Sequence, residues 1–117
     1  MFKISKQFTF SASHVLDMLP ATHQCARLHG HNYIVEVVLE AEELNEVGFV
    51  KDYLALSELK TYIDDELDHR HLNDVFDFPT TAENIALYLY NWAHEKWPQV
   101  VAMRVSETPK TWAEYRP

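Results

Sequence analysis

Cysteine and glycine are both scarce in this chain of 117 residues, which holds one cysteine and two glycines. A single thiol cannot form an internal disulfide, so we expect a reducing compartment, by default the cytoplasm, and a thiol that is free for chemistry. It also excludes a structural zinc site built from several cysteines. With only two glycines, the chain lacks the glycine-rich fingerprint that binds nicotinamide dinucleotides.

Long apolar runs and an excess of basic charge are missing as well. The most apolar stretch, residues 33–39, is broken by Glu36, and the N-terminus lacks the apolar region of a targeting signal, so we expect no membrane segment. The formal net charge of −8 argues against binding to nucleic acid or to an anionic membrane. An anionic substrate therefore needs a local basic cluster, and we take Arg27 as its first member.

The composition is that of an ordinary globular protein, with 47% hydrophobic and 24% charged residues, and the length suits one domain over residues 1–117. Alternation of apolar and polar residues with a period of two predicts four strands, over residues 2–13, 29–40, 100–107 and 111–116. Apolar residues at three- and four-residue intervals predict a helix that follows a cap at Asp52 and ends around Leu67. A second helix is predicted from an N-cap at Thr80 to just before Pro98.

The predicted order is strand, strand, helix, helix, strand, strand. This is an α+β fold with a four-stranded antiparallel sheet. Residues 68–74, between the helices, are too polar and unpatterned for an element and are predicted to form a loop. Two helices can cover only one face of such a sheet, so its other face or its edges need another subunit. We therefore expect an oligomer.

Three histidines can meet at one end of the first two strands. His29 and His31 are separated by one residue and share a strand face, and His14 ends the core-facing row of the preceding strand. If these strands pair as a hairpin, the three imidazoles leave one position of a tetrahedral zinc ion open, which is typical of a catalytic site. A histidine pair with this spacing also occurs by chance in packed or surface positions.

Three further residues are candidates for chemistry, and each has a plainer alternative. Asp68 follows the first helix, where an acid opposes the helix dipole; it either orients the imidazole of His69 in an acid–base relay or lies in a solvated loop. Glu107 ends a core-facing row, and its carboxylate either accepts two parallel N–H bonds from a guanidine-like ring edge or turns to solvent. We interpret the remaining histidines as surface residues: His23, His71 and His94.

Five motifs occur in order along the chain: Phe8-x-Phe10-Ser11-Ala12-x-His14, Cys25-x-x-x-His29-Gly30-His31-Asn32-Tyr33, Asp68-His69-x-x-Leu72-Asn73, Pro79-Thr80-Thr81-Ala82-Glu83-Asn84 and Val105-x-Glu107-Thr108. Together they resemble the 6-pyruvoyl- and 6-carboxy-tetrahydropterin synthase family over nearly the whole chain. The short spacing from Cys25 to His29 is more similar to the bacterial 6-carboxy-tetrahydropterin synthases of queuosine biosynthesis. Ser13 departs from the alanine that is common in the family.

This resemblance implies a tunnelling fold (T-fold), in which ββααββ protomers form trimeric barrels that stack in pairs as a homohexamer. The Zn²⁺ ligands that it implies are His14, His29 and His31. The catalytic groups that it implies are Cys25 and the pair Asp68–His69, which can serve the cysteine of a neighbouring subunit. Two substrate contacts are implied in addition, the pterin anchor Glu107 and the weaker candidate Thr81.

The reaction implied by the resemblance converts 7,8-dihydroneopterin triphosphate into 6-carboxy-5,6,7,8-tetrahydropterin, acetaldehyde and triphosphate. Zinc acts as Lewis acid, Cys25 as general base and Asp68–His69 as the partner proton carrier. Two alternatives stay open: the pyruvoyl-forming reaction, which uses the same groups, and a non-catalytic oligomer that binds zinc or a pterin. Product analysis distinguishes the carboxy-forming reaction from the pyruvoyl-forming one. Replacement of Cys25 by alanine distinguishes an enzyme, which loses activity, from a binding oligomer, which has none to lose.

Overall fold

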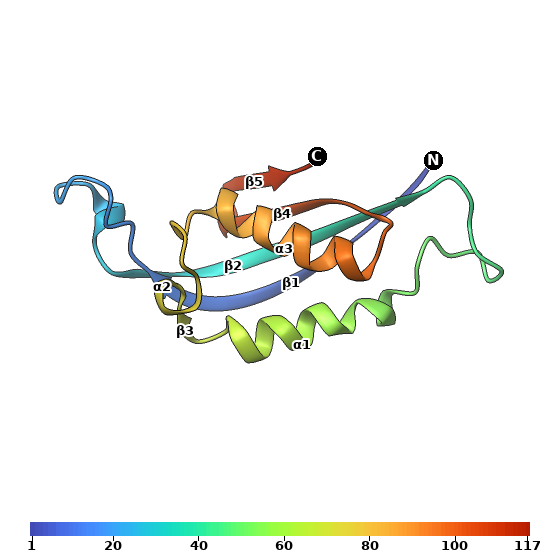
Figure 1. Cartoon of the computed structure of the whole chain (residues 1–117), viewed down its shortest axis with the longest axis horizontal. Helices are drawn as coiled ribbons and strands as arrows, with labels where there is room; N and C mark the ends of the chain where they lie inside the picture. Colours follow the sequence, from blue (N-terminus) through green and yellow to red (C-terminus); the bar gives the residue numbers. More distant parts are fainter.

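The longest feature of the computed structural model, which describes residues 1–117, is a hairpin of two thirteen-residue strands (Figure 1). Strand β1 (Phe2–His14) pairs antiparallel with β2 (His29–Ala41) along its full length, so that His14 lies opposite His29. The predicted pairing of these two strands is therefore confirmed. It puts the last residue of β1 beside the first residue of β2.

The sheet has five strands in the order β3–β1–β2–β4–β5. β4 (Val100–Thr108) pairs antiparallel with β2, and β5 (Thr111–Tyr115) pairs antiparallel with β4. The fifth strand, β3 (Arg70–His71), runs parallel to β1 and forms one edge of the sheet. The predicted four-stranded antiparallel sheet is thus wrong by one strand. A two-residue strand is too short to show any periodicity, so the sequence pattern could not reveal it.

The first long helix begins in two steps. The Asp52 carboxylate accepts a hydrogen bond from the backbone N–H of Leu54 and so caps the 3-10 helix η2 (Tyr53–Leu56). Helix α1 (Ser57–Glu66) follows directly and has no side-chain cap of its own. The predicted end near Leu67 is confirmed, but the predicted cap at Asp52 belongs to the 3-10 segment.

The second long helix, α3 (Ala82–Lys96), is capped by Thr81, whose hydroxyl accepts a hydrogen bond from the backbone N–H of Asn84. The predicted N-cap at Thr80 is wrong by one residue. Two consecutive threonines offer the same capping hydroxyl, and the local sequence does not say which one points along the helix. Thr80 is fully buried and makes a different contact, described below.

Two short helical segments were not predicted, and one of them begins within the predicted loop 68–74. The 3-10 helix η1 (Gln24–Ala26) interrupts the connection between β1 and β2, and α2 (Leu72–Val75) follows β3. Both are three or four residues long, which is below the length at which apolar periodicity becomes visible. No helix of the chain combines the length and the apolar character needed to span a bilayer.

One hydrophobic core lies between the sheet and the two long helices, which cover the same face of the sheet (Figure 1). Alternate residues of β1 and β2, such as Phe10 and Tyr33, contribute the sheet side, and α1 and α3 contribute Ile63 and Leu89. Each such side chain stabilises the fold by roughly 1.5–3 kcal/mol when it is buried. The row on β1 continues into His14, which is also fully buried. The core therefore ends in an imidazole.

Candidate metal centre

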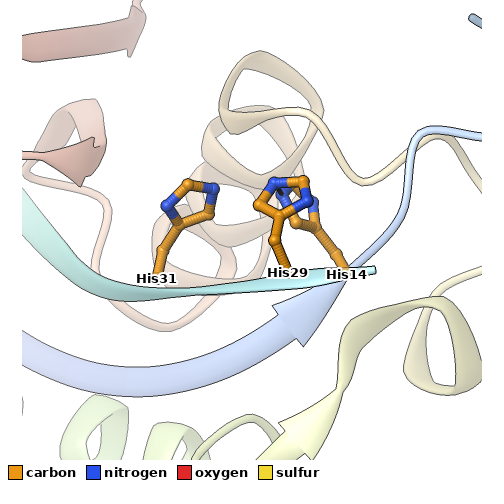
Figure 2. Close-up of side chains that lie close together, drawn as sticks. All are labelled: His14, His29 and His31. Atoms are coloured by element: carbon orange, nitrogen blue, oxygen red, sulfur yellow. Dashed lines mark hydrogen bonds between the residues drawn. The ribbon is translucent and has the colours of Figure 1, made fainter. Parts of the chain in front are cut away.

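Three imidazoles converge at the end of the hairpin, and Figure 2 shows their rings on the same side of the two strands. His14 and His29 are paired across the hairpin, and His31 follows two residues later on the same strand face. One ligating nitrogen from each ring lies within 4.8 Å of the others. The ring centroids are 4.6 to 5.1 Å apart. The predicted convergence of these histidines is confirmed.

Backbone carbonyls determine which ring nitrogen of two histidines faces the centre. Nδ1 of His14 lies 2.9 Å from the carbonyl oxygen of Thr80, and Nδ1 of His29 lies 2.6 Å from the carbonyl oxygen of Arg27. Because a carbonyl can only accept, each Nδ1 must carry a hydrogen, so Nε2 is the nitrogen that offers a lone pair when the ring is neutral. These two Nε2 atoms are 3.0 Å apart. Two neutral rings at this distance bring their lone pairs together, so the arrangement favours a shared cation, either a proton or a metal ion.

A carboxylate joins the imidazoles from β4. Oε2 of Glu107 lies 3.3 Å from Nε2 of His14 and 3.1 Å from Nε2 of His31. The hydrogen bond with His14 is the main reason why the pKa of the Glu107 carboxyl lies below its ordinary value; burial opposes this shift, and the charge of the nearby imidazoles supports it. Glu107 thus lies on the covered face of the sheet, as predicted, and its carboxylate contacts the imidazoles of His14 and His31.

This donor set fits a divalent transition-metal ion. Imidazole nitrogens in their neutral form are the commonest protein ligands of such ions, and a carboxylate nearby offsets the charge of the ion. Burial lowers the pKa of His31, the neighbouring His14 and His29 lower it further, and only Glu107 opposes the shift. The neutral, ligating form of His31 is therefore favoured. The group formed by His14, His29 and His31 could hold one metal ion.

Asp68 and His69 form a contact beside β1. One carboxylate oxygen of Asp68 accepts a hydrogen bond from the backbone N–H of Ser11 at 2.9 Å, and the other lies 3.0 Å from Nδ1 of His69. The Ser11 hydrogen bond, followed by that of His69, holds the pKa of Asp68 below its usual value. His69 has a φ of 59°, which residues other than glycine rarely adopt, and its side chain is 83% exposed. The ionised carboxylate of Asp68 therefore orients the exposed imidazole of His69.

Cys25 and Arg27 lie on the connection that leads into β2. Cys25 is a half-buried free thiol in η1, and its backbone N–H donates to Nδ1 of His23. Arg27 has an exposed side chain and contributes only its carbonyl oxygen to the centre. No hydrogen bond links the Cys25 thiol to the three histidines or to Asp68 and His69. A single chain therefore brings the three imidazoles and Glu107 together, and no hydrogen bond joins them to the Cys25 thiol.

Two hollows open beside His31. One, of about 470 Å³, is lined by Tyr33, Glu107 and Thr108 among others, and the other, of about 460 Å³, by Ser11, His69 and His71 among others. His31 contributes to both. Hollows of this size suit a small-molecule ligand, and their position leaves His31 accessible from outside the core.

The sequence matches the family model described as 6-pyruvoyl tetrahydropterin synthase over residues 3–117. The chain belongs to this family. A 6-carboxy-5,6,7,8-tetrahydropterin synthase of Bacillus subtilis is 33% identical, and the match covers 99% of this chain and 86% of the relative. A dihydroneopterin monophosphate aldolase of Pyrococcus furiosus is 35% identical over 87% of this chain and 83% of the relative. The fold matches 6-pyruvoyl tetrahydropterin synthase of Caenorhabditis elegans with a TM-score of 0.86, at 26% identity and covering 99% and 95% of the two chains.

Sequence reasoning missed two residues at the centre of this 6-pyruvoyl tetrahydropterin synthase family member. Thr80, expected as a helix cap, contacts His14 instead, and Thr81, expected at the substrate, uses its hydroxyl to cap α3. Tyr33 is fully buried beside His31, and its hydroxyl has no hydrogen-bond partner. Burial, and then the charge of Glu107, raises the pKa of Tyr33. Both residues lie in motifs of the sequence, Tyr33 at the end of the Cys-to-Tyr motif and Thr80 in the motif that begins at Pro79, but neither motif indicated these contacts.

Proposed function

We propose that this chain is a zinc-dependent carbon–carbon lyase that converts 7,8-dihydroneopterin triphosphate and one water molecule into 6-carboxy-5,6,7,8-tetrahydropterin, acetaldehyde and triphosphate. The observation that carries the proposal is the set of three imidazoles gathered around one point beside Glu107. The relatives named 6-carboxy-5,6,7,8-tetrahydropterin synthase support this choice of reaction. We place the reaction in queuosine biosynthesis, the pathway of the bacterial enzymes that the chain resembles.

The chain's own residues have distinct roles in this proposal. His14, His29 and His31 hold the zinc ion, which when bound supplies Lewis acidity to the side-chain hydroxyls of the substrate. Glu107, whose low pKa keeps it ionised, accepts two N–H bonds from the amino-pyrimidinone edge of the pterin. Thr81 and Arg27 are weaker candidates for substrate contacts. The hydroxyl of Thr81 already caps α3, and the side chain of Arg27 is exposed to solvent.

Proton transfer is assigned to Cys25 and to the pair Asp68–His69. As a thiolate, Cys25 removes a proton from a substrate carbon, and His69, oriented by Asp68, carries a proton as its partner. No hydrogen bond joins the two groups within one chain, and the imidazole of His69 is exposed and so available to another copy. This arrangement supports an active site shared between subunits.

A homohexamer of two stacked trimers is the assembly that we propose, in the cytoplasm, where a free thiol persists. Two sheet edges are open in the single chain: the outer edge of β5, and that of β1 except where β3 covers it. Open strand edges are sites where another chain can pair. Light scattering coupled to size-exclusion chromatography measures the subunit number directly, and a monomer at micromolar concentration would contradict the shared site.

The reaction is tested by incubating zinc-loaded protein with 7,8-dihydroneopterin triphosphate and identifying the products by mass spectrometry. We expect acetaldehyde together with 6-carboxy-5,6,7,8-tetrahydropterin. A pyruvoyl product without acetaldehyde would show that the second reaction of the family is the correct one. The monophosphate should be assayed in parallel, because one relative is named dihydroneopterin monophosphate aldolase. Turnover of the monophosphate alone would also overturn the proposal.

The role of Cys25 is tested by Cys25→Ala in the same assay. We expect turnover to fall by about 10²- to 10⁴-fold, the usual contribution of a general base, while zinc content and pterin binding remain. The matched control is Ser57→Ala, since this small side chain lies at the start of α1 and outside the proposed machinery. A wild-type chain that binds the pterin but turns nothing over would instead identify a binding module.

A further inference from the structure

Thr80 is a fully buried polar residue whose two oxygen atoms meet the same histidine nitrogen. Its carbonyl oxygen lies 2.9 Å, and its hydroxyl oxygen 3.1 Å, from Nδ1 of His14. His14 is also fully buried, and 66 residues separate the two along the chain. Buried hydrogen bonds in a medium of low dielectric are strong, and an unpaired partner there is costly. This contact is therefore a specific link between the start of α3 and the metal centre.

We propose that Thr80 is the positioning residue that holds His14 with its hydrogen on Nδ1 and its lone pair on Nε2, directed toward the metal. The inference rests on the proposed metal site. Both oxygens of Thr80 accept from the single Nδ1–H, so a ring turned by half a rotation about its axis loses both bonds at once. Outer hydrogen bonds of this kind fix the tautomer and orientation of metal-binding histidines.

The neighbours of Thr80 hold it firmly in place. Asn84, in the first turn of α3, donates its side-chain N–H to the carbonyl oxygen of Pro79 at 2.9 Å. The backbone N–H of the same asparagine donates to the Thr81 hydroxyl. Asn84 thus fixes the residue on either side of Thr80. By contrast, His29 is oriented by Arg27, only two residues before it and exposed. The helix therefore gives His14 a more rigid support than the loop gives His29.

The tautomer is measured first in the wild-type protein, by long-range ¹H–¹⁵N NMR of the histidine rings without metal and with zinc. We expect a hydrogen on Nδ1 of His14 in both states, and a bare Nε2 in the zinc-bound state. A His14 ring without a hydrogen on Nδ1 in either state would overturn the proposal. This measurement needs no variant, so it stands even if substitutions at this buried position impair folding.

Three variants then separate positioning from stability, with Co²⁺ affinity read from its visible absorption. Thr80→Val keeps the shape of the side chain and the backbone carbonyl but removes the hydroxyl. We expect the dissociation constant for Co²⁺ to rise about 10-fold, at the lower end of the range for loss of a hydrogen-bond partner of a metal ligand. Thr80→Ser restores the hydroxyl and should restore the affinity. Leu89→Ala removes a buried side chain further along α3, and should lower the thermal midpoint with no change in affinity.

The outcomes distinguish this inference from the metal site on which it rests. If the wild-type chain binds no Co²⁺ or Zn²⁺, the proposed metal site itself is wrong. If it binds the metal and Thr80→Val binds equally well, or if Thr80→Ser loses as much affinity as the valine variant, only the role of Thr80 is wrong. An equal loss in Leu89→Ala would also overturn it, because helix stability alone would then explain the effect.

Discussion

The two faces of the sheet are built from the same strands but satisfy their polar groups in different ways. On the open face, the Glu36 carboxylate already accepts from Arg104, Gln7 and Ser5. On the covered face, His14 and His29 have their Nδ1 atoms hydrogen-bonded to carbonyls, and their Nε2 atoms face each other. Polar residues thus occur on both faces. Only the covered face has a group of imidazole nitrogens that can bind a cation.

The largest effect is expected from removal of one imidazole of the covered face. His31→Ala leaves two nitrogen ligands where a catalytic zinc site needs three protein ligands, so we expect stoichiometric metal binding and turnover to be lost. Isothermal titration with Zn²⁺ measures the binding. His94→Ala is the control, since this histidine contacts the Val100 carbonyl far from the centre. Metal binding by His31→Ala at wild-type affinity would remove the distinction between the two faces.

The second effect concerns the core behind the site. Leu89 on α3 is fully buried, and Leu89→Ala should lower the free energy of unfolding by about 2–5 kcal/mol, since it leaves a cavity. Leu87, two residues earlier and 38% exposed, is the matched control, and its alanine variant should lose about 0.5 kcal/mol or less. Urea unfolding of both variants measures the difference. Equal losses would mean that α3 does not pack on the sheet as described.

The third effect is a gain in stability. The hydroxyl of Tyr33 is buried without a partner, which costs about 1–3 kcal/mol relative to a paired group. Tyr33→Phe removes this group and keeps the ring stacked on Phe10, so we expect the free energy of unfolding to rise by about 1 kcal/mol. The same urea unfolding series measures it. A loss of stability would show that the hydroxyl has a bonding partner, which would give the covered face another functional group.

The smallest effect is expected on the open face, and it depends on pH. Burial raises the pKa of Glu36, but hydrogen bonds from Arg104, Gln7 and Ser5 outweigh it and bring the pKa below the ordinary 4.5. A carboxylate with a lowered pKa in the folded state stabilises the fold above its unfolded pKa and loses this contribution as the pH falls through the folded value. Glu36→Gln should therefore cost about 1 kcal/mol or less at pH 7.

The pH series supplies the control for this variant. The stability difference between wild type and Glu36→Gln should shrink below the ordinary pKa of 4.5, because the wild-type carboxylate then becomes protonated as well. Unfolding at pH 7 and at pH 3 measures both ends of this range. A difference that stays constant between the two would mean that the Glu36 charge contributes nothing to stability.

Prediction from sequence succeeded where a residue's place follows from its neighbours along the chain. Alternation located β1, β2, β4 and β5, and it placed His29 and His31 on one face of a strand. It failed for β3, whose two residues pair with β1 only because α1 returns the chain to that edge. The capping-box pattern also failed to show which of Thr80 and Thr81 caps α3, since both side chains have the chemistry of a helix cap.

The sequence by itself determined the order of the elements, the hairpin row that ends in His14, and the family. These properties depend on local periodicity and on the identity of a few residues, both of which can be read along the chain. Only the tertiary structure decided that Glu107 meets the imidazoles and that Thr80 orients His14 across 66 residues. Such contacts depend on how β4 and α3 pack against the hairpin, and packing geometry is set by many side chains together rather than by a local pattern.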